Sequence, residues 1–120
     1  MATFKLYIND NTIHYHDKMI GRINFSECEI LKALLQNQGV VVSRTQLLEV
    51  AWPGKIVSSN SVSMAIKNLR ECFTSQGFDD VIITHVKKGF SWNKEHSIEI
   101  VNNIFFDNSR NTMKLGKVRT

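Results

Sequence analysis

Residues 43–73 read SRTQLLEVAWPGKIVSSNSVSMAIKNLRECF, and this stretch decides the fold. Ser43 opens a Ser-x-x-Gln sequence, the form of a helix capping box, so we expect a helix to begin there. Pro53 ends that helix, and the loop over residues 53–58 leads to a longer helix predicted over about 59–76, beginning at Ser59. Two helices joined by such a short loop are typical of a helix-turn-helix.

The longer helix is amphipathic, which predicts the face that it leaves to solvent. Apolar residues recur at helical spacing and predict the inward stripe, which consists of Val62, Ile66, Leu69 and Phe73. The opposite face then carries Asn60, Ser61, Ser63, Met64, Lys67, Asn68 and Arg70. Short polar side chains near the start of a helix suit base edges in the major groove of DNA, and cations further along suit phosphates.

A β-hairpin follows the longer helix. The apolar run over 81–86 predicts one strand, Lys87-Lys88-Gly89 a turn, and Phe90 to Trp92 the returning strand. The tip of this hairpin is basic, because Lys87 and Lys88 occupy it. We expect the segment 86–90 to reach the backbone or minor groove beside the site of the helix.

The remaining elements complete one domain over residues 1–94. Alternating residues over 1–25 predict an antiparallel β-meander, and 26–76 hold three helices, the first opened by a Ser26-x-x-Glu29 capping box. With the hairpin over 81–94, the predicted fold class is α+β: a winged helix-turn-helix with an N-terminal meander, three helices and a C-terminal wing. Residues 95–120 predict an extra strand and a polar tail or linker.

Charge is distributed in agreement with an anionic partner. The chain has 120 residues and a formal net charge of +4. Residues 43–94 hold seven Lys or Arg against four Asp or Glu, so most of the positive excess lies in the helix-turn-helix and the hairpin. No signal peptide or membrane span is evident, and we expect a cytoplasmic location, either for a stand-alone regulator or for the cytoplasmic part of an inner-membrane-tethered one.

The sequence gives little support for an enzyme. It contains no Gly-rich phosphate loop, no His/Cys cluster and no visible Ser/His/Asp arrangement, so we expect no catalysis, no cofactor and no metal site. His14 and His16 lie two residues apart without an evident third ligand. Cys28 and Cys72 lack a Cys-x-x-Cys spacing and are interpreted as small apolar residues on helix faces.

The order of these motifs resembles a known family. The run from Gly39 to Leu48, Trp52-Pro53, the helix to Arg70 and the segment from Ile82 to Phe90 are similar to the OmpR/PhoB-type winged helix over about residues 20–93. The Trp-Pro ending and the Lys-Lys-Gly-Phe wing resemble ToxR-like regulators, including the CadC and PsaE types. The resemblance implies a DNA-binding domain of a transcriptional regulator.

The resemblance also implies roles for individual positions. Ser61, Ser63 and Asn68 match base-reading or base-adjacent positions, and Asn60, Lys67 and Arg70 match backbone contacts. Trp52 matches an aromatic residue that approaches phosphate, while Thr84, Lys87 and Lys88 match the wing. Asn60 and Asn68 stand where many relatives carry Arg. Since Asn pairs with adenine and Arg with guanine, a site rich in A·T pairs is expected.

Two functions remain open from the sequence. The first is sequence-specific binding of double-stranded promoter DNA by a bacterial-type regulator, as a homodimer or as tandem protomers. The second is a winged-helix module that contacts RNA polymerase or a partner regulator without intrinsic DNA affinity. The loop over 53–58 is the candidate for polymerase contact, because the resembled family uses that region for it.

Overall fold

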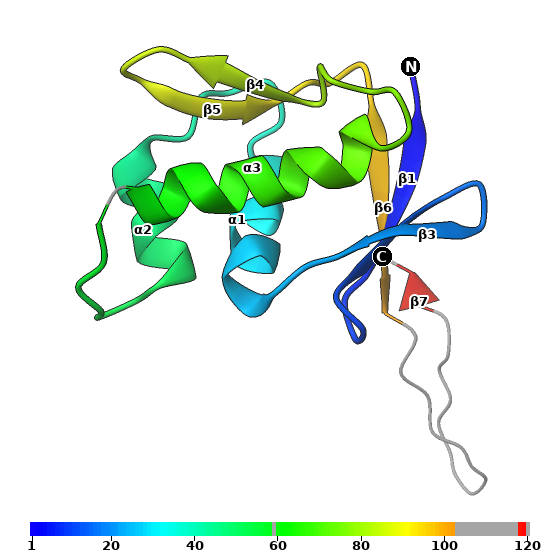
Figure 1. Ribbon diagram of the computed structural model, residues 1–120, viewed down its shortest axis with the longest axis horizontal. Coiled ribbons are helices and arrows are strands. Elements are labelled where there is room, and N and C mark those ends of the chain that lie inside the picture. Colours follow the sequence, from blue (N-terminus) through cyan, green and yellow to red (C-terminus); the bar gives the residue numbers. More distant parts are fainter. Residues whose placement is uncertain (59, 103–117, 120) are drawn as a thin grey trace, which may run out of the picture.

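The computed structural model describes residues 1–58, 60–102 and 118–119, and its elements follow the predicted order (Figure 1). Three helices, a sheet and a hairpin confirm the α+β winged-helix prediction. The elements are β1 (Thr3–Tyr7), β2 (Thr12–Tyr15), β3 (Lys18–Arg22), α1 (Phe25–Gln36), α2 (Arg44–Ala51), α3 (Asn60–Thr74), β4 (Ile82–His85), β5 (Gly89–Trp92), β6 (Ser97–Asn102) and β7 (Val118–Arg119).

One sheet has the strand order β3-β2-β1-β6-β7. The strands β1, β2 and β3 form the predicted antiparallel meander. β6 pairs with β1 in parallel, from Thr3 opposite Ser97 to Tyr7 opposite Val101, so the extra strand over 97–102 extends the N-terminal sheet. β7 adds antiparallel to β6, in a part of the chain where the sequence predicted a tail. Residues 103–117 and 120 of that tail lie outside the described residues.

The capping prediction for α1 is wrong by two residues. The helix is capped by Asn24, whose side-chain oxygen accepts from the backbone N–H of Glu27, while the Glu27 carboxylate accepts from the Asn24 N–H. Ser26 lies inside the first turn instead, because Asn-x-x-Glu satisfies the same two donors two residues earlier. The box at Ser43 and Gln46 is confirmed. Ser59, the predicted start of the recognition helix, lies outside the described residues.

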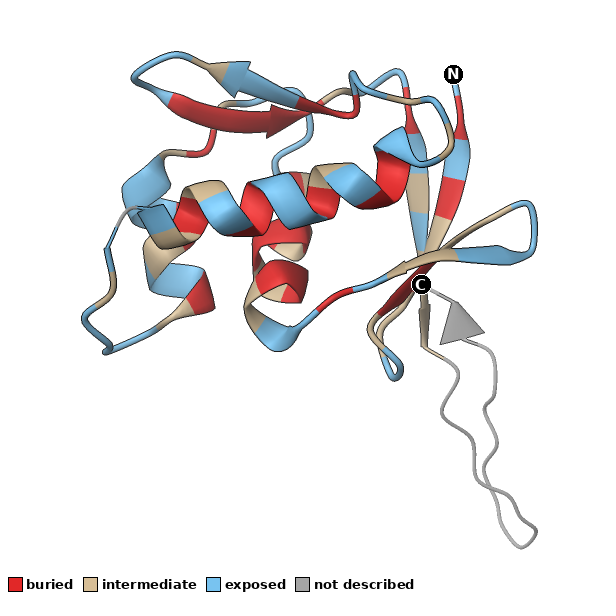
Figure 2. Cartoon of the chain, in the orientation of Figure 1, coloured by how far each residue is buried: buried red, intermediate tan, exposed pale blue. Residues whose placement is uncertain are grey.

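α3 is the element around which the core is built. Its predicted inward stripe is confirmed, since Val62, Ile66, Leu69 and Phe73 are at most 1% exposed. Figure 2 shows these buried positions recurring along one side of the helix, while the other side is exposed. At its C-terminal end, Phe73 packs edge-on against Phe4 of β1 and against Trp92 of β5, with ring centroids 4.7 and 5.9 Å apart. Phe73 therefore joins the sheet and the wing through one side chain.

The wing is attached to the link between α1 and α2. Val42 and Phe90 exchange two backbone hydrogen bonds, of 2.7 and 3.0 Å, which add the link to the hairpin as a single bridge. Gly89 makes this approach possible. Its φ is 144°, and a Cβ atom built on it would lie 2.0 Å from the carbonyl oxygen of Val42. A side chain at this position would therefore push the wing off the helices.

We expect Gly89→Ala to destabilise the fold by about 3 kcal/mol or more, since it adds a backbone clash to an unfavourable φ. Gly54→Ala is the matched control: its φ is 71° and no atom lies within 4 Å of the new Cβ, so it isolates the cost of positive φ, about 1–2 kcal/mol. Urea denaturation measures both. Equal losses would show that the contact with Val42 does not constrain the wing.

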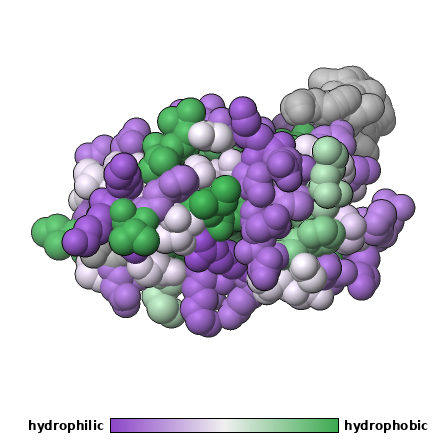
Figure 3. Space-filling view, turned by 90° about the horizontal axis from the view of Figure 1, so that it is seen from above, coloured by the Kyte–Doolittle hydropathy of each residue, from purple (hydrophilic) through white to green (hydrophobic). Residues whose placement is uncertain are grey.

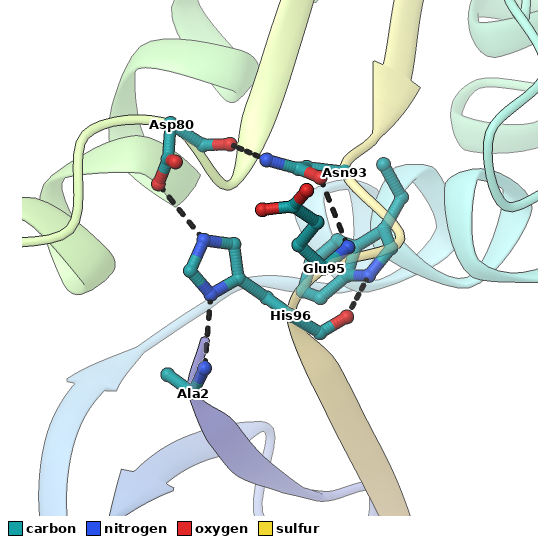
Figure 4. Close-up of polar contacts among 6 residues, drawn as sticks. Ala2, Asp80, Asn93, Glu95 and His96 are labelled. Atoms are coloured by element: carbon teal, nitrogen blue, oxygen red, sulfur yellow. Dashed lines mark hydrogen bonds and ion pairs between the residues drawn. The ribbon is translucent and has the colours of Figure 1, made fainter.

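A polar cluster around His96 fastens the C-terminal end of the wing to the sheet (Figure 4). The backbone N–H of Ala2 donates to His96 Nδ1 over 3.1 Å, so the ring proton is on Nε2, which donates to the Asp80 carboxylate over 2.8 Å. Trp92 Nε1 donates to the His96 carbonyl oxygen, and Asn93 donates to the carbonyl oxygen of Asp80. The segment before β4 and Ala2, which precedes β1, are thereby fixed to His96, which precedes β6.

Both cysteines are buried and free, as the sequence indicated. Burial raises the pKa of each thiol, that of Cys72 to about 11, so the thiolate form is disfavoured at neutral pH. None of the helices in the described residues is long and apolar enough to cross a membrane.

Candidate nucleic-acid interface

The outward face of α3 is present as predicted, but its residues differ in exposure. Asn60, Met64, Lys67 and Asn68 are exposed, whereas Ser61, Ser63 and Arg70 are half-buried. The wing lies along one side of this helix and α1 along the other (Figure 1). The structure therefore brings the predicted α3 residues together on one surface, bordered on one side by the wing that carries Thr84, Lys87 and Lys88.

Arg70 is engaged within the protein. Its Nε and Nη2 donate to the carbonyl oxygen of Ile82 over 3.2 and 2.8 Å, and Nη2 also donates to Thr84 Oγ1 over 2.6 Å. The guanidinium carbon lies 5.9 Å from the centroid of the Phe90 ring. Burial lowers the pKa of Arg70, yet an arginine keeps its charge in such surroundings. The Arg70 guanidinium thus holds the wing through its hydrogen bonds to Ile82 and Thr84. The predicted phosphate contact uses this same group.

Arg44 is a residue that the sequence reasoning missed. It is the first residue of α2, and its Nη1 donates to Ser63 Oγ of α3 over 2.8 Å. Its guanidinium carbon lies 5.1 Å from the centroid of the Phe90 ring. Two arginines, Arg44 of α2 and Arg70 of α3, therefore lie close to this ring. The signal was its place directly after the capping Ser43, where a side chain at a helix start lies beside the next helix of the motif. Arg44 places an exposed cation next to Ser63.

Asn68, a predicted base reader, donates its amide N–H to Glu27 Oε2 over 2.8 Å. Glu27 is 5% exposed, and its other oxygen accepts from Asn24 in the capping box. A buried carboxylate needs such donors, because an unpaired one is strongly disfavoured. Asn68 therefore ties α3 to the start of α1, and sequence reasoning missed this link because the two residues are 41 positions apart.

Lys67 also has a partner on its own helix. Its Nζ lies 2.8 Å from Glu71 Oε2, and both side chains are more than 60% exposed. Exposed pairs of this kind contribute little to stability, so the lysine can exchange its carboxylate for a phosphate at small cost. The prediction that Lys67 contacts the DNA backbone remains compatible with this geometry.

A hollow of about 250 Å³ lies between the start of α1 and the N-terminal half of α3. Polar side chains of both helices line it together with Met64 and the half-buried Trp52, the residue at the end of α2. Its lining residues are Asn24, Ser26, Glu27, Trp52, Asn60, Ser61, Met64, Ala65 and Asn68. The predicted phosphate residue Trp52 therefore lies beside the first turn of α3.

The wing tip and most of the loop before α3 are exposed to solvent. Lys87 and Lys88 are exposed at the tip, and Val86 is 77% exposed beside them. In the loop over 53–58, Ile56 is fully exposed. Seen from the wing side, the surface is mostly hydrophilic, with hydrophobic residues in separate small patches (Figure 3). Such a surface suits a polar, charged partner better than an extended apolar one.

We expect Asn68→Ala to destabilise the protein by about 1–3 kcal/mol, because it withdraws a donor from the buried Glu27 carboxylate. Asn60→Ala is the control. That exposed side chain makes no hydrogen bond among the described residues, so its change stays within about 0.5 kcal/mol. Urea denaturation compares the two. If Asn68→Ala is as stable as Asn60→Ala, the hydrogen bond to Glu27 does not stabilise the fold.

We expect Arg70→Met to loosen the wing while keeping most of the apolar stem of the side chain. Loss of its hydrogen bonds to Ile82 and Thr84 costs about 1–3 kcal/mol. Amide hydrogen exchange then rises in β4 and β5 before it rises in α1. Unchanged protection of the wing amides would contradict the role of this fork.

Comparisons with known proteins agree on one family. The family model described as "Transcriptional regulatory protein, C terminal" matches residues 22–92. Protein PsaE of Yersinia pseudotuberculosis serotype I (strain IP32953) is 33% identical over 76 residues, which make up 63% of this chain and 36% of that protein. The chain thus spans about a third of the length of this curated relative.

Two solved structures share the fold. The C-terminal domain of the nisin resistance regulator NsrR, a lantibiotic response regulator, is 27% identical with a TM-score of 0.63, covering 77% of this chain and 92% of that one. The DNA-binding domain of E. coli CadC is 24% identical with a TM-score of 0.63, covering 70% of this chain and 79% of that one.

Proposed function

Because the chain belongs to the Trans_reg_C family, the C-terminal domain of transcriptional regulatory proteins, we propose that it binds a specific sequence of double-stranded DNA with α3 in the major groove. The family match confirms the OmpR/PhoB-type resemblance seen in the sequence, and the similarity to PsaE and to the CadC domain agrees with its ToxR-like character. The observation that carries the proposal is the juxtaposition of the exposed face of α3 with a wing whose tip bears two lysines.

We infer that different parts of the interface have different tasks. The first turns of α3 present Asn60, Ser61 and Met64 to base edges. Lys67 of α3 and Lys87 and Lys88 of the wing supply contacts to phosphate, as does Arg44 from the start of α2. Trp52 lies beside the first turn of α3, where an indole N–H suits a phosphate oxygen. Ser63 and Asn68 act mainly by holding α3 against Arg44 and Glu27.

The positive charge on α3 itself is modest, since Lys67 faces Glu71 and Arg70 is engaged with the wing. One protomer therefore binds a half-site weakly, and a homodimer or tandem protomers on adjacent half-sites raise the affinity. We infer that such protomers bind together on promoter DNA in the cytoplasm. This holds equally for a stand-alone regulator and for the cytoplasmic part of a tethered one.

The proposal is tested by selecting bound fragments from genomic DNA and measuring binding of the 120-residue chain at several salt concentrations. We expect Lys87→Ala/Lys88→Ala to reduce the slope of log K against log salt by about two, because each lysine releases about one counterion. Lys18→Ala, an exposed lysine on β3, leaves the slope unchanged. If both variants show the same slope, the wing lysines do not contact the DNA.

One observation favours a second function for the same domain. Ile56 is fully exposed in the loop between α2 and α3, which suits contact with a protein such as RNA polymerase. If the intact chain shows no salt-dependent retention on DNA even at low ionic strength, a protein-binding module replaces the DNA-binding proposal. If Ile56→Ser keeps DNA binding but loses transcription from the selected promoter, the loop serves a partner in addition.

A further inference from the structure

We propose that Met64 reads the C5-methyl group of a thymine, and so determines an A·T pair in the DNA site. This inference rests on the proposed function, and it names the base feature that the middle of α3 recognises. Met64 is 51% exposed on the face of α3 opposite the buried stripe. It is an apolar side chain in the middle of an otherwise polar face.

The polar neighbours of Met64 further along the helix already have partners. Lys67 pairs with Glu71 in an exposed ion pair that it can exchange for a phosphate, so it is assigned to the DNA backbone. Asn68 donates to the buried Glu27. Beside it, Ser63 accepts from Arg44. In contrast, no side-chain hydrogen bond within the described part of the chain engages Asn60 or Ser61. The surface available to a base edge is therefore Asn60, Ser61 and Met64.

These three residues lie close together on the helix. Met64 follows Asn60 by four positions and Ser61 by three, so its side chain lies one turn further along the same face. All three line the hollow beside Trp52. When the N-terminal half of α3 enters the major groove, Met64 enters with the two hydrogen-bonding residues and contacts the base pair next to theirs.

The chemistry of the major groove then selects the target. Every base pair offers hydrogen-bonding groups there, and the thymine methyl is the apolar group among them. Methionine is flexible and polarisable, and it has no strong hydrogen-bond donor or acceptor to satisfy. Placed against a hydrogen-bonding edge it would desolvate polar atoms without replacing their bonds, whereas against the methyl it buries apolar surface on both sides.

The test uses thymine with and without its methyl group. A site is first obtained with the 120-residue chain by selection from amplified, unmethylated DNA, which leaves thymine as the source of C5-methyl groups. Duplexes of that site are then made with each thymine replaced in turn by deoxyuridine, which lacks the methyl and keeps the O4 acceptor. Dissociation constants are measured for the wild-type chain and three variants: Met64→Ala, Met64→Leu and Met19→Ala.

We expect deoxyuridine at one position of each half-site to weaken wild-type binding about four-fold, the factor for removing one methyl group from a buried apolar contact. For Met64→Ala the ratio between thymine and deoxyuridine at that position falls to about one, which identifies the coupled pair. Met64→Leu restores the ratio. Met19→Ala keeps it, because Met19 is 47% exposed but belongs to β3.

The outcomes separate this inference from the proposed function. A wild-type chain that binds its site but is indifferent to deoxyuridine at every position overturns the role of Met64. A Met64→Ala chain of unchanged urea midpoint that keeps the full four-fold ratio overturns it as well. Failure of the wild-type chain to retain any fragment contradicts the DNA-binding proposal itself.

Discussion

The packing of Phe73 between Phe4 and Trp92 is the contact on which the rest of the structure depends. It fixes the C-terminal end of α3 to the sheet and to the wing at once. Since Val62, Ile66 and Leu69 continue the same buried stripe, the rotation of the helix about its axis is determined. That rotation decides which side chains face outward. The identity of the interface therefore follows from the core, before any charge is considered.

The polar residues of α3 serve two purposes, and the structure separates them. Arg70 and Asn68 donate hydrogen bonds to neighbouring elements, Arg70 to Ile82 of the wing and Asn68 to Glu27 of α1. They give the helix a fixed position relative to its neighbours, which a recognition element requires if its contacts are to be specific. Asn60, Ser61 and Met64 remain for base edges, and Lys67 for phosphate. Affinity must then come largely from cations outside the exposed face of α3, at the wing tip and at the start of α2.

The elements of the fold were predictable because their signals are local. The stripe on α3, the Ser43 capping box and the basic hairpin turn each depend on residues a few positions apart. The prediction was wrong where two capping motifs competed, and it missed contacts between residues that are far apart in the sequence. Asn24 and Ser26 both begin a capping-box sequence. Which of the two caps α1 depends on where the chain leaves β3. The contact of Asn68 with Glu27 requires the helices to be packed, so the spacing of residues carried no signal for it. For the contact of Arg44 with Ser63, the signal was the place of Arg44 directly after the capping Ser43.

The parallel pairing of β1 with β6 has a consequence for how the chain folds as it is made. Thr3 and Ser97 are 94 positions apart, and the strands of the meander are neighbours in sequence. At about 5–20 residues per second, β1 waits roughly 5–20 s on the ribosome before β6 exists to cover its edge. During that time the meander, the helices and the wing can assemble through nearer contacts, and the sheet closes last. β1 is thus synthesised before the helices and the wing, yet it is among the last of these elements to acquire its full set of neighbours.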